Sequence, residues 1–340
     1  MRLATYNVAW FDHLFDDTGA LREDEGWSGL QDVRRADQIA ALGQVFAALD
    51  ADAVMVIEAP DSNRRRDGAR ALETFAARFG LRARRALIGF LNDTQQEIAL
   101  LYDPAAITPR HDPQGAPTGK KGARDAPRFD SVFRVDLDLD GRADLVNWSK
   151  PPLELACETA AGTRFRMIGV HAKSKAPHGA RGAAEVTRVA IENRRKQLAQ
   201  CIWLRARVAA HLDAGDPLIV LGDFNDGPGL DDYEKLFGRS GVEIVLGEDS
   251  GIPLFDPHAH RALTSRFAAP TTARFKLPPD GVYLSALLDY IMVSPDLRAH
   301  QPRWQIWHPF DTPACYHSPA LREALLAASD HFPVTIDIAI

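Results

Sequence analysis

Apolar residues along the chain fall into two alternating patterns, short continuous runs and helical spacings. Apolar residues three and four positions apart predict helices over residues 39–49 and 72–79, and one long helix over 183–213. Strands interleaved with helices in this way are typical of an α/β protein. The apolar runs of strand length occupy residues 3–8, 53–57, 97–102, 165–170, 217–222, 287–293 and 332–338.

Four longer stretches carry neither pattern: residues 11–35, 103–130, 247–283 and 300–328. They are rich in Gly, Pro and polar residues, a composition that predicts loops. No change of composition divides the chain, and no internal repeat is present. We therefore expect residues 1–340 to form a single domain with loop insertions near these four stretches.

The composition is that of a globular protein, because 46% of the 340 residues are hydrophobic and 25% are charged. No run approaches the length of about 18 apolar residues that a membrane span needs. Asn7 interrupts the first apolar run before a signal peptide could form. Cys157, Cys201 and Cys315 form no C-x-x-C pair, which argues against disulfides and structural zinc. The sequence therefore predicts a cytoplasmic protein without a transmembrane segment.

Charge is unevenly distributed along this chain, whose net charge is −6. Residues 164–207 hold 11 Lys and Arg against only Glu185 and Glu192, and residues 64–85 hold eight Arg against two acidic residues. A basic surface on an acidic protein fits a site that handles phosphate. Ordinary solvated helix faces explain the same clusters, and both interpretations stay open.

Polar residues able to bind a metal recur at or beside the ends of the apolar runs. A polar group at the end of a buried strand costs free energy unless it is paired or bound to a cation. Eight such residues predict one shared site at an edge of the sheets, and their oxygen-rich chemistry favours Mg²⁺ or Mn²⁺ over zinc. The residues are Asn7, Glu58, His171, Asp223, Asn225, Asp289, Asp330 and His331.

Six short segments carry a resemblance to a known family, and they occur in the family's order along nearly the whole chain. The sequence resembles the endonuclease/exonuclease/phosphatase superfamily, and within it the bacterial nuclease-like members. The resemblance implies a four-layered α/β sandwich in which two mainly antiparallel β-sheets pack face to face with helices outside. The segments are Thr5-Tyr6-Asn7, Val56-Ile57-Glu58, Gly169-Val170-His171, Gly222-Asp223-Phe224-Asn225, Leu288-Asp289-Tyr290-Ile291 and Ser329-Asp330-His331-Phe332-Pro333-Val334.

The resemblance also implies a metal site and the groups that activate water. Glu58 would be the main carboxylate ligand of Mg²⁺ or Mn²⁺, with Asn7 nearby and Asp330 completing the metal cluster. Asp223 would align or deprotonate the attacking water. Asn225 would donate a hydrogen bond to a phosphoryl oxygen.

Two histidines would act on the phosphate itself. The resemblance implies that His331 contacts the scissile phosphate as an acid, a base or an electrostatic stabiliser. Asp289 would hold its imidazole in the productive tautomer. His171 would lie on the opposite side of the phosphate. The resemblance leaves open which group is the general base.

Basic residues beside His171 are candidate substrate-binding groups. The period of two residues along a strand would place His171, Lys173 and Lys175 on one face. A following helix with an Arg pattern that includes Arg194 occurs in bacterial nuclease-like members of the superfamily. The entry Lys150-Pro151-Pro152-Leu153 resembles their Arg-Pro-Pro-Leu segment, with Lys in place of Arg.

These observations together predict a divalent-metal-dependent phosphoesterase. We expect a phosphodiesterase or nuclease that cleaves P–O bonds by in-line attack of an activated water. Its partner is then a phosphate-ester substrate, with nucleic acid as one candidate. A lipid or small-molecule phosphodiesterase or phosphatase of the same superfamily is the alternative. A catalytically silent binding protein is disfavoured, because every site position is filled. The sequence predicts no oligomeric state.

Overall fold

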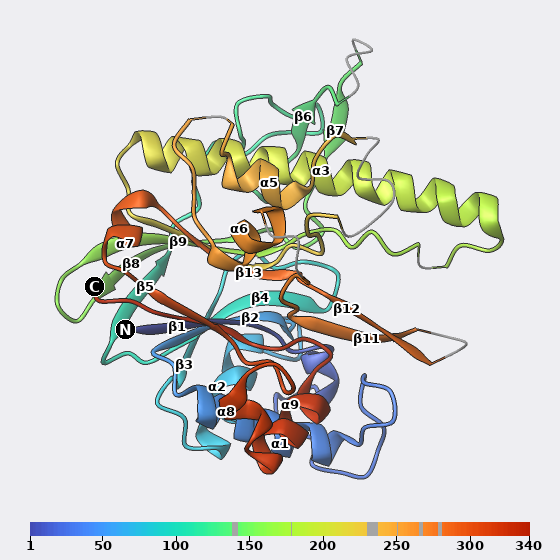
Figure 1. Cartoon of the computed structure of the whole chain (residues 1–340), viewed down its shortest axis with the longest axis vertical. Helices are drawn as coiled ribbons and strands as arrows, with labels where there is room; N and C mark the ends of the chain where they lie inside the picture. Colours follow the sequence, from blue (N-terminus) through green and yellow to red (C-terminus); the bar gives the residue numbers. More distant parts are fainter. Residues whose placement is uncertain (138–141, 178, 230–236, 250, 265–267, 278–280) are drawn as a thin grey trace.

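Two β-sheets lie face to face at the centre of the computed structural model, and helices cover the outer face of each (Figure 1). The layers therefore run helix, sheet, sheet, helix, which confirms the expected four-layered α/β sandwich. The structure describes residues 1–137, 142–177, 179–229, 237–249, 251–264, 268–277 and 281–340.

The first sheet has the amino-terminal strand at its centre. Adjacent strands of this sheet run antiparallel to each other, except for β1 and β2, which are parallel. In order across the sheet, the strands among the described residues are β14 (Arg303–Ile306), β15 (Val334–Asp337), β1 (Arg2–Asn7), β2 (Ala53–Pro60), β4 (Gln96–Tyr102) and β3 (Arg85–Ile88).

The second sheet also contains one parallel pair, β9 and β10, among antiparallel neighbours. Both sheets are thus mixed, although antiparallel pairs predominate as expected. In the part of the chain that the structure describes, the order is β13 (Asp289–Val293), β10 (Leu218–Asp223), β9 (Arg164–His171), β8 (Leu153–Thr159) and β5 (Ile107–His111). Two hairpins stand apart, β6 (Phe133–Val135) with β7 (Asp144–Val146) and β11 (Ala273–Leu277) with β12 (Val282–Ala286).

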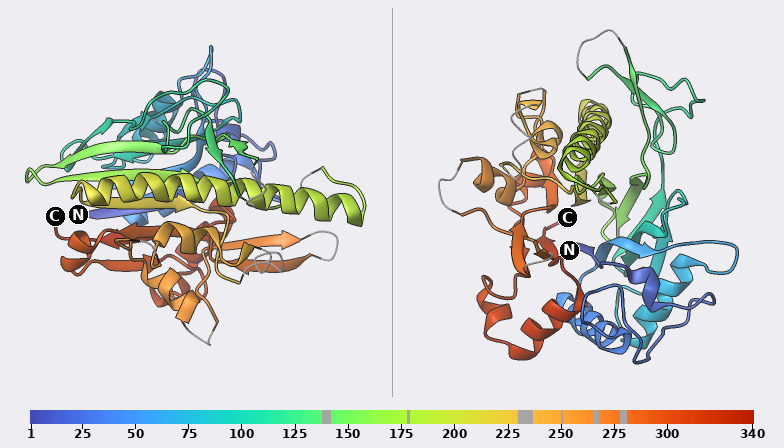
Figure 2. Two further views of the ribbon diagram at one scale, coloured as in Figure 1. Left: turned by 90° about the horizontal axis from the view of Figure 1, so that it is seen from above. Right: turned by 90° about the vertical axis from the view of Figure 1, so that its right-hand side faces the viewer.

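Helices form the two outer layers. Those of the first sheet are α1 (Arg35–Leu49), α2 (Gly68–Arg78), α8 (Pro313–Tyr316), α9 (Pro319–Ala328) and the 3-10 turn η1 (Phe11–Leu14). Those on the side of the second sheet are α3 (Ala183–Asp213), α5 (Gly241–Leu246), α6 (Pro257–Thr264) and α7 (Pro295–Ala299). The long helix predicted over 183–213 is confirmed as α3, and its exposed first turns extend beyond the sheets (Figure 2).

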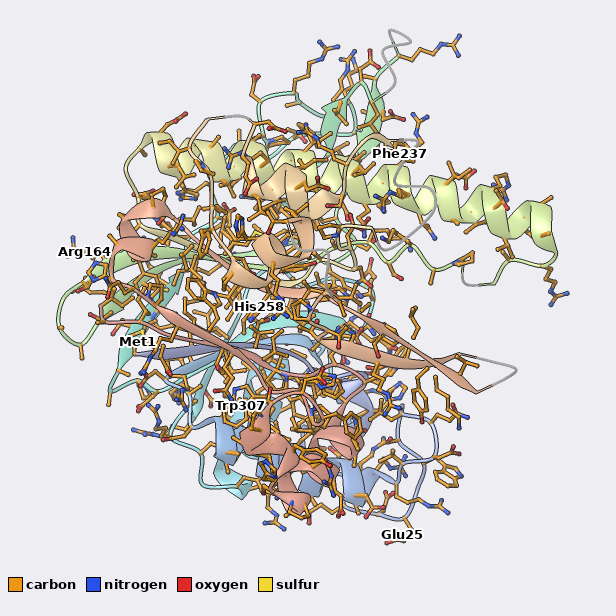
Figure 3. The ribbon with its side chains drawn as sticks, viewed as in Figure 1. Met1, Glu25, Arg164, Phe237, His258 and Trp307 are labelled. Atoms are coloured by element: carbon orange, nitrogen blue, oxygen red, sulfur yellow. The ribbon has the colours of Figure 1, made fainter. Side chains whose placement is uncertain are left out.

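The core explains why the strands are continuous apolar runs. Met55 and Ile57 of β2 pack between the two sheets, whereas Val54 and Val56 pack against the helices outside. A strand buried on both faces needs apolar residues at every position rather than at alternate ones. Side chains fill the spaces between layers, as at Trp307, whose buried Nε1 donates to Thr335 Oγ1 at 3.0 Å (Figure 3).

All four expected loop insertions are wrong in part, because each contains regular structure among the described residues, as η1 does in residues 11–35. Residues 103–130 include β5, which is short and alternates buried and exposed positions at the sheet edge. Residues 247–283 include α6 and β11, and residues 300–328 include β14, α8 and α9. Pro313 and Pro319 start α8 and α9, a position at which proline favours a helix rather than a loop.

Two other sequence expectations concern helices and cysteines. Among the described residues, no helix has both the length and the apolar character that crossing a membrane requires. Cys157, Cys201 and Cys315 are all free and buried.

Candidate active site

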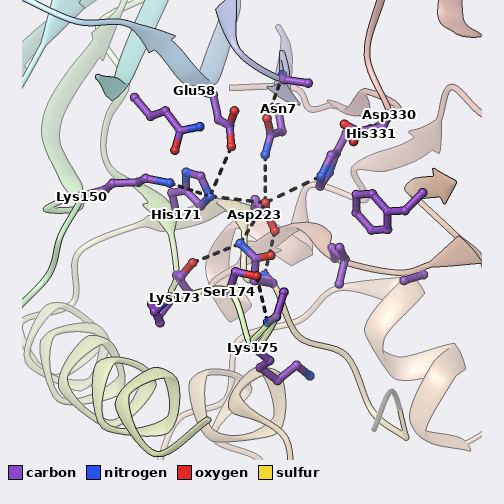
Figure 4. Close-up of a pocket in the computed structure, with 18 of the residues that line it drawn as sticks. Asn7, Glu58, Lys150, His171, Lys173, Ser174, Lys175, Asp223, Asp330 and His331 are labelled. Carbon is purple, nitrogen blue, oxygen red and sulfur yellow. Dashed lines mark hydrogen bonds and ion pairs between the residues drawn. The ribbon is translucent and has the colours of Figure 1, made fainter. Parts of the chain in front are cut away.

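The carboxyl ends of the parallel strands converge at one edge of the sandwich. β1 ends at Asn7, and Glu58 lies near the end of β2, the strand beside it. In the second sheet, β9 and β10 end in register at His171 and Asp223, and Asp289 of β13 pairs with Asp223. Because parallel strands end on the same side, four side chains from distant segments meet in one cavity (Figure 4).

His331 is held by a carboxylate from the opposite sheet. Its Nδ1 lies 2.8 Å from Asp289 Oδ2, and its Nε2 lies 4.0 Å from Asp223 Oδ2. Burial lowers the pKa of His331, but the carboxylates of Asp289, Asp223 and Asp330 outweigh it and raise this pKa to about 10. His331 is therefore an imidazolium at neutral pH, with Nδ1 donating to Asp289.

Asp223 is fully buried and is oriented by two asparagines. Asn7 Nδ2 donates to Oδ2 at 2.9 Å, and the Asn225 backbone N–H donates to Oδ1 at 2.7 Å. Burial raises the pKa of Asp223 to about 7, although His331 opposes the shift. A carboxylate with a pKa near neutrality is suited to accept a proton from water.

The Gly-Asp-Phe-Asn segment at the end of β10 contains two residues with an unusual backbone conformation, Gly222 and Asn225. Gly222 has φ +141°, and a Cβ there would lie 2.0 Å from the carbonyl oxygen of Val170. No other residue fits at this close approach of β10 to β9. Asn225 adopts a left-handed φ of 49°, which asparagine tolerates better than most residues, and its Nδ2 donates to Ala172 O at 3.1 Å.

Glu58 leaves the sheet at a β-bulge. The register of β2 against β4 shifts between Ile57 and Ala59, and Glu58 between them has a positive φ of 62°. Such strain in a non-glycine residue persists only where the surrounding structure imposes it, and it is common at functional sites. Glu58 Oε2 accepts the backbone N–H of Trp10 at 3.0 Å, and Oε1 faces the cavity 4.0 Å from His171 Nε2.

His171 has a basic neighbour, Lys150, that the sequence did not place in the site. Lys150 Nζ lies 3.4 Å from His171 Nε2. Burial, with Lys150 and His331 adding to it, lowers the pKa of His171 well below its usual value, so this imidazole is neutral. Burial also lowers the pKa of Lys150. The Lys-Pro-Pro-Leu entry to β8 was the available signal.

The donor set fits a hard divalent cation. Asn7, Glu58 and Asp330 offer amide and carboxylate oxygens on one cavity, without a thiolate. Burial raises the pKa of both Glu58 and Asp330, so their ionised forms need a compensating positive charge. Among the described residues, Asp223, Asp289 and His331 form a second group whose ligand atoms lie within 4.8 Å of one another. The hydrogen bond of His331 to Asp289 and its ion pair with Asp223 already explain why these three side chains lie together.

The predicted substrate-binding residues all line the cavity, but not through strand geometry. β9 ends at His171, so the expectation that Lys173 and Lys175 share its strand face is wrong. Burial lowers the pKa of Lys173. Lys175 Nζ donates to Asp226 Oδ1 at 2.5 Å, and Arg194, buried on α3, contacts the same oxygen at 3.2 Å. Substrate binding by these three residues stays a prediction.

Asp226 joins three segments beneath the site and was missed from the sequence. Its carboxylate also accepts the Gly241 backbone N–H at the start of α5, at 2.6 Å. We expect Asp226→Ala to lower the free energy of unfolding by about 3–5 kcal/mol, because it removes the buried carboxylate that pairs with the buried Arg194 and the partly buried Lys175. Urea denaturation measures this. Asp249→Ala, at an exposed ion pair, is the control and should change stability by less than about 0.5 kcal/mol. Equal stability of both variants would contradict the role of Asp226.

Most arginines of the basic 164–207 region that the structure describes are paired with acidic residues from elsewhere. Arg188 lies 2.8 Å from Glu192, and Arg195 lies 3.0 Å from Asp144 on β7. These pairs reduce the local surplus of positive charge and favour the interpretation of ordinary helix faces for these arginines. Arg164, Arg166, Arg194 and Arg207 are likewise paired, with Glu158, Asp112, Asp226 and Glu154.

The comparisons with known proteins concern the family and the fold of the chain. The sequence profile of the Endonuclease/Exonuclease/phosphatase family matches residues 4–331. No curated protein matches the chain. Among solved structures, the endonuclease/exonuclease/phosphatase from Bacteroides vulgatus has a TM-score of 0.50 and 14% identity, over 99% of this chain and 98% of that one.

Two further solved structures are similar to this chain at comparably low identity. The 3′ phosphatase NExo from Neisseria, bound to a product DNA hairpin, has a TM-score of 0.49 and 16% identity, covering 100% of both chains. The catalytic domain of human Nocturnin with bound sulfate has a TM-score of 0.47 and 14% identity, over 100% of this chain and 94% of that one.

Proposed function

This chain belongs to the Endonuclease/Exonuclease/phosphatase family, whose members hydrolyse phosphate esters, and we propose that it is a divalent-metal-dependent phosphodiesterase. The observation that carries the proposal is one cavity lined by the buried Asp223, the bulged Glu58 and His331, which Asp289 holds in place. In-line phosphoryl transfer needs a positioned water and neutralised charge, and this cavity supplies groups for both.

Asp223 and His331 have different roles in the proposed reaction. Asp223, held by Asn7 and Asn225, accepts a proton from the attacking water as the new P–O bond forms. The imidazolium of His331 stabilises the negative charge of the phosphoryl group while the ester P–O bond breaks and the leaving alkoxide departs, taking up a proton from solvent. The neutral His171 lies across the cavity.

Glu58 and Asp330, with Asn7 beside them, would hold Mg²⁺ or Mn²⁺. When bound, such an ion polarises a phosphoryl oxygen and neutralises developing charge. The buried carboxylates supply the negative charge that binds the ion, and the bulge at Glu58 turns its side chain out of the sheet toward the cavity.

A nucleic acid and a smaller diester remain the two candidate substrate classes. Cleavage of a nucleic acid was the leading expectation, and it needs cations along the strand beyond the scissile phosphate. Arg188 and Arg195 on α3 were the cations expected to bind the strand, but both are already paired with carboxylates. This observation favours the small-molecule or lipid diester as the substrate. A cytoplasmic location is part of the same proposal.

A hydrolysis panel tests the proposed function. We expect bis-p-nitrophenyl phosphate to be cleaved faster than p-nitrophenyl phosphate, and only with Mg²⁺ or Mn²⁺, since chelation with EDTA removes the charge that pairs with Glu58 and Asp330. The panel also contains supercoiled DNA, single-stranded DNA, RNA, sphingomyelin and an inositol phosphate. Faster cleavage of the monoester, or full activity in EDTA, would contradict the proposal.

Salt dependence of the best substrate separates the two substrate classes. Affinity for duplex DNA falls by about 0.9 log unit per phosphate contact for each tenfold rise in salt, whereas a small diester offers one charge and a shallow slope. The paired arginines lead us to expect the shallow slope. A steep slope would identify a nucleic-acid substrate instead.

A further inference from the structure

One wall of the catalytic cavity is apolar, and the β11–β12 hairpin forms it. Phe275 on β11 and Leu284 on β12 are directly opposite in register, so their side chains lie on one face of the hairpin. Both line the cavity, together with Ala286 and Leu288. The Phe275 ring lies edge-on to the His331 imidazole, with centroids 5.5 Å apart. The apolar wall thus begins beside a group that acts on the phosphate.

Backbone hydrogen bonds fix this hairpin to the catalytic segment. The Arg274 N–H donates to Asp330 O at 2.8 Å, and the Phe332 N–H donates to Thr272 O at 2.6 Å. Thr272 Oγ1 also accepts the backbone N–H groups of Leu288 and Asp289, both at 3.0 Å. Because these bonds flank His331 on both sides, the wall and the imidazolium keep one relative position.

The rest of the cavity has the opposite character. Lys150 and Lys173 line it, as do the metal-site carboxylates of Glu58 and Asp330. The cavity measures about 860 Å³, which is large enough for a phosphate and an organic group bound together. Leu284 is 43% exposed, so apolar surface remains available at the mouth. An uncovered leucine beside a phosphate site is a poor surface for a polyanionic strand and a good one for an uncharged apolar group.

We propose that Phe275 and Leu284 form a binding subsite for an aromatic or aliphatic group that is esterified to the phosphate of the substrate. The substrate is then a small phosphodiester with an apolar substituent. This inference rests on the proposed phosphodiesterase function and adds the substrate class to it. Burial of such a group in an apolar pocket contributes roughly 1–3 kcal/mol, a factor of about 10–200 in selectivity.

Symmetric diesters test the subsite, because both organic groups are the same and the direction of binding does not matter. Calorimetry with Mg²⁺ present compares dimethyl phosphate with diphenyl phosphate. We expect the wild type to bind diphenyl phosphate at least about tenfold more tightly. Phe275→Ala and Leu284→Ala should each remove most of that preference and leave the affinity for dimethyl phosphate within about threefold.

Tyr283→Ala is the matched control. Tyr283 is an aromatic residue of the same hairpin on the opposite face, 50% exposed, with the Arg274 guanidinium 3.8 Å from its ring centroid. It should keep the preference for diphenyl phosphate. Leu284→Ala removes a half-exposed side chain, so it tests the subsite even if Phe275→Ala fails to fold.

The outcomes separate this inference from the proposed function. Equal affinity of the wild type for the two diesters, or a preference that survives both Phe275→Ala and Leu284→Ala, overturns the subsite. Cleavage of bis-p-nitrophenyl phosphate by the same preparation then shows that the phosphodiesterase proposal stands. Absence of that cleavage with Mg²⁺ and with Mn²⁺ overturns the phosphodiesterase proposal instead.

Discussion

Replacing His331 with alanine lowers kcat by about 10²–10⁴-fold, the usual loss when a group that transfers protons or stabilises charge is removed. The carboxylates around His331 raise its pKa to about 10, so the wild type presents a positive charge at neutral pH that alanine lacks. Asp223→Asn should lower kcat on a similar scale, because an amide accepts no proton from water. Steady-state kinetics with bis-p-nitrophenyl phosphate measures both effects.

Two further variants serve as comparisons for His331→Ala and Asp223→Asn. Lys173→Ala should act mainly on KM, since Lys173 lines the cavity and supplies charge without contacting Asp223 or His331 in any bond that the structure describes. His300→Ala, at an exposed position outside the cavity, controls for loss of a histidine and should leave kcat unchanged. An equal loss of kcat in Lys173→Ala would place that lysine in the transition state and contradict our division of roles.

Glu58→Gln should weaken the affinity for Mg²⁺ by orders of magnitude while the fold is kept. Glutamine has nearly the same shape and can still accept the Trp10 N–H, but it lacks the negative charge that binds a divalent cation. Calorimetry with Mg²⁺ measures the binding directly, and a metal titration of activity should shift to higher concentration.

Glu25→Gln provides the matched control, because Glu25 is an exposed glutamate that does not line the cavity. It should bind Mg²⁺ as the wild type does. Wild-type affinity in Glu58→Gln would show that the metal lies elsewhere, with the group of Asp223, Asp289 and His331 as the next candidate.

The core strands, and the polar residues at their ends, were predictable because a buried strand consists almost entirely of apolar residues. β2 and β10 are apolar at nearly every position, so their ends and the polar residues there were visible at once. The edge strand β5 is only five residues long and includes Pro109, so it has too few apolar positions to be distinguished from a loop. Sequence periodicity describes core strands better than edges.

Residues that act through contacts distant in sequence were not predictable from spacing or periodicity. Lys150 comes near His171 only when β8 and β9 pair, and the Lys-Pro-Pro-Leu entry was the one signal that pointed to it. Asp226 follows the Gly-Asp-Phe-Asn segment directly, yet its partners Lys175 and Arg194 come from a loop and from α3. The wall of Phe275 and Leu284 becomes apparent only when the hairpin lies against His331.

The position of β1 at the centre of the first sheet has a consequence for biosynthesis. Its antiparallel neighbour β15 is the last strand of the sheet to leave the ribosome, more than 300 residues after β1. Contacts so distant in sequence form slowly and late. A nascent chain that ends before Asp330 lacks His331 and β15 as well, so it contains neither the complete first sheet nor the full set of cavity residues. The first sheet therefore cannot close, and His331 cannot meet Asp289, until residues 330–337 have been synthesised.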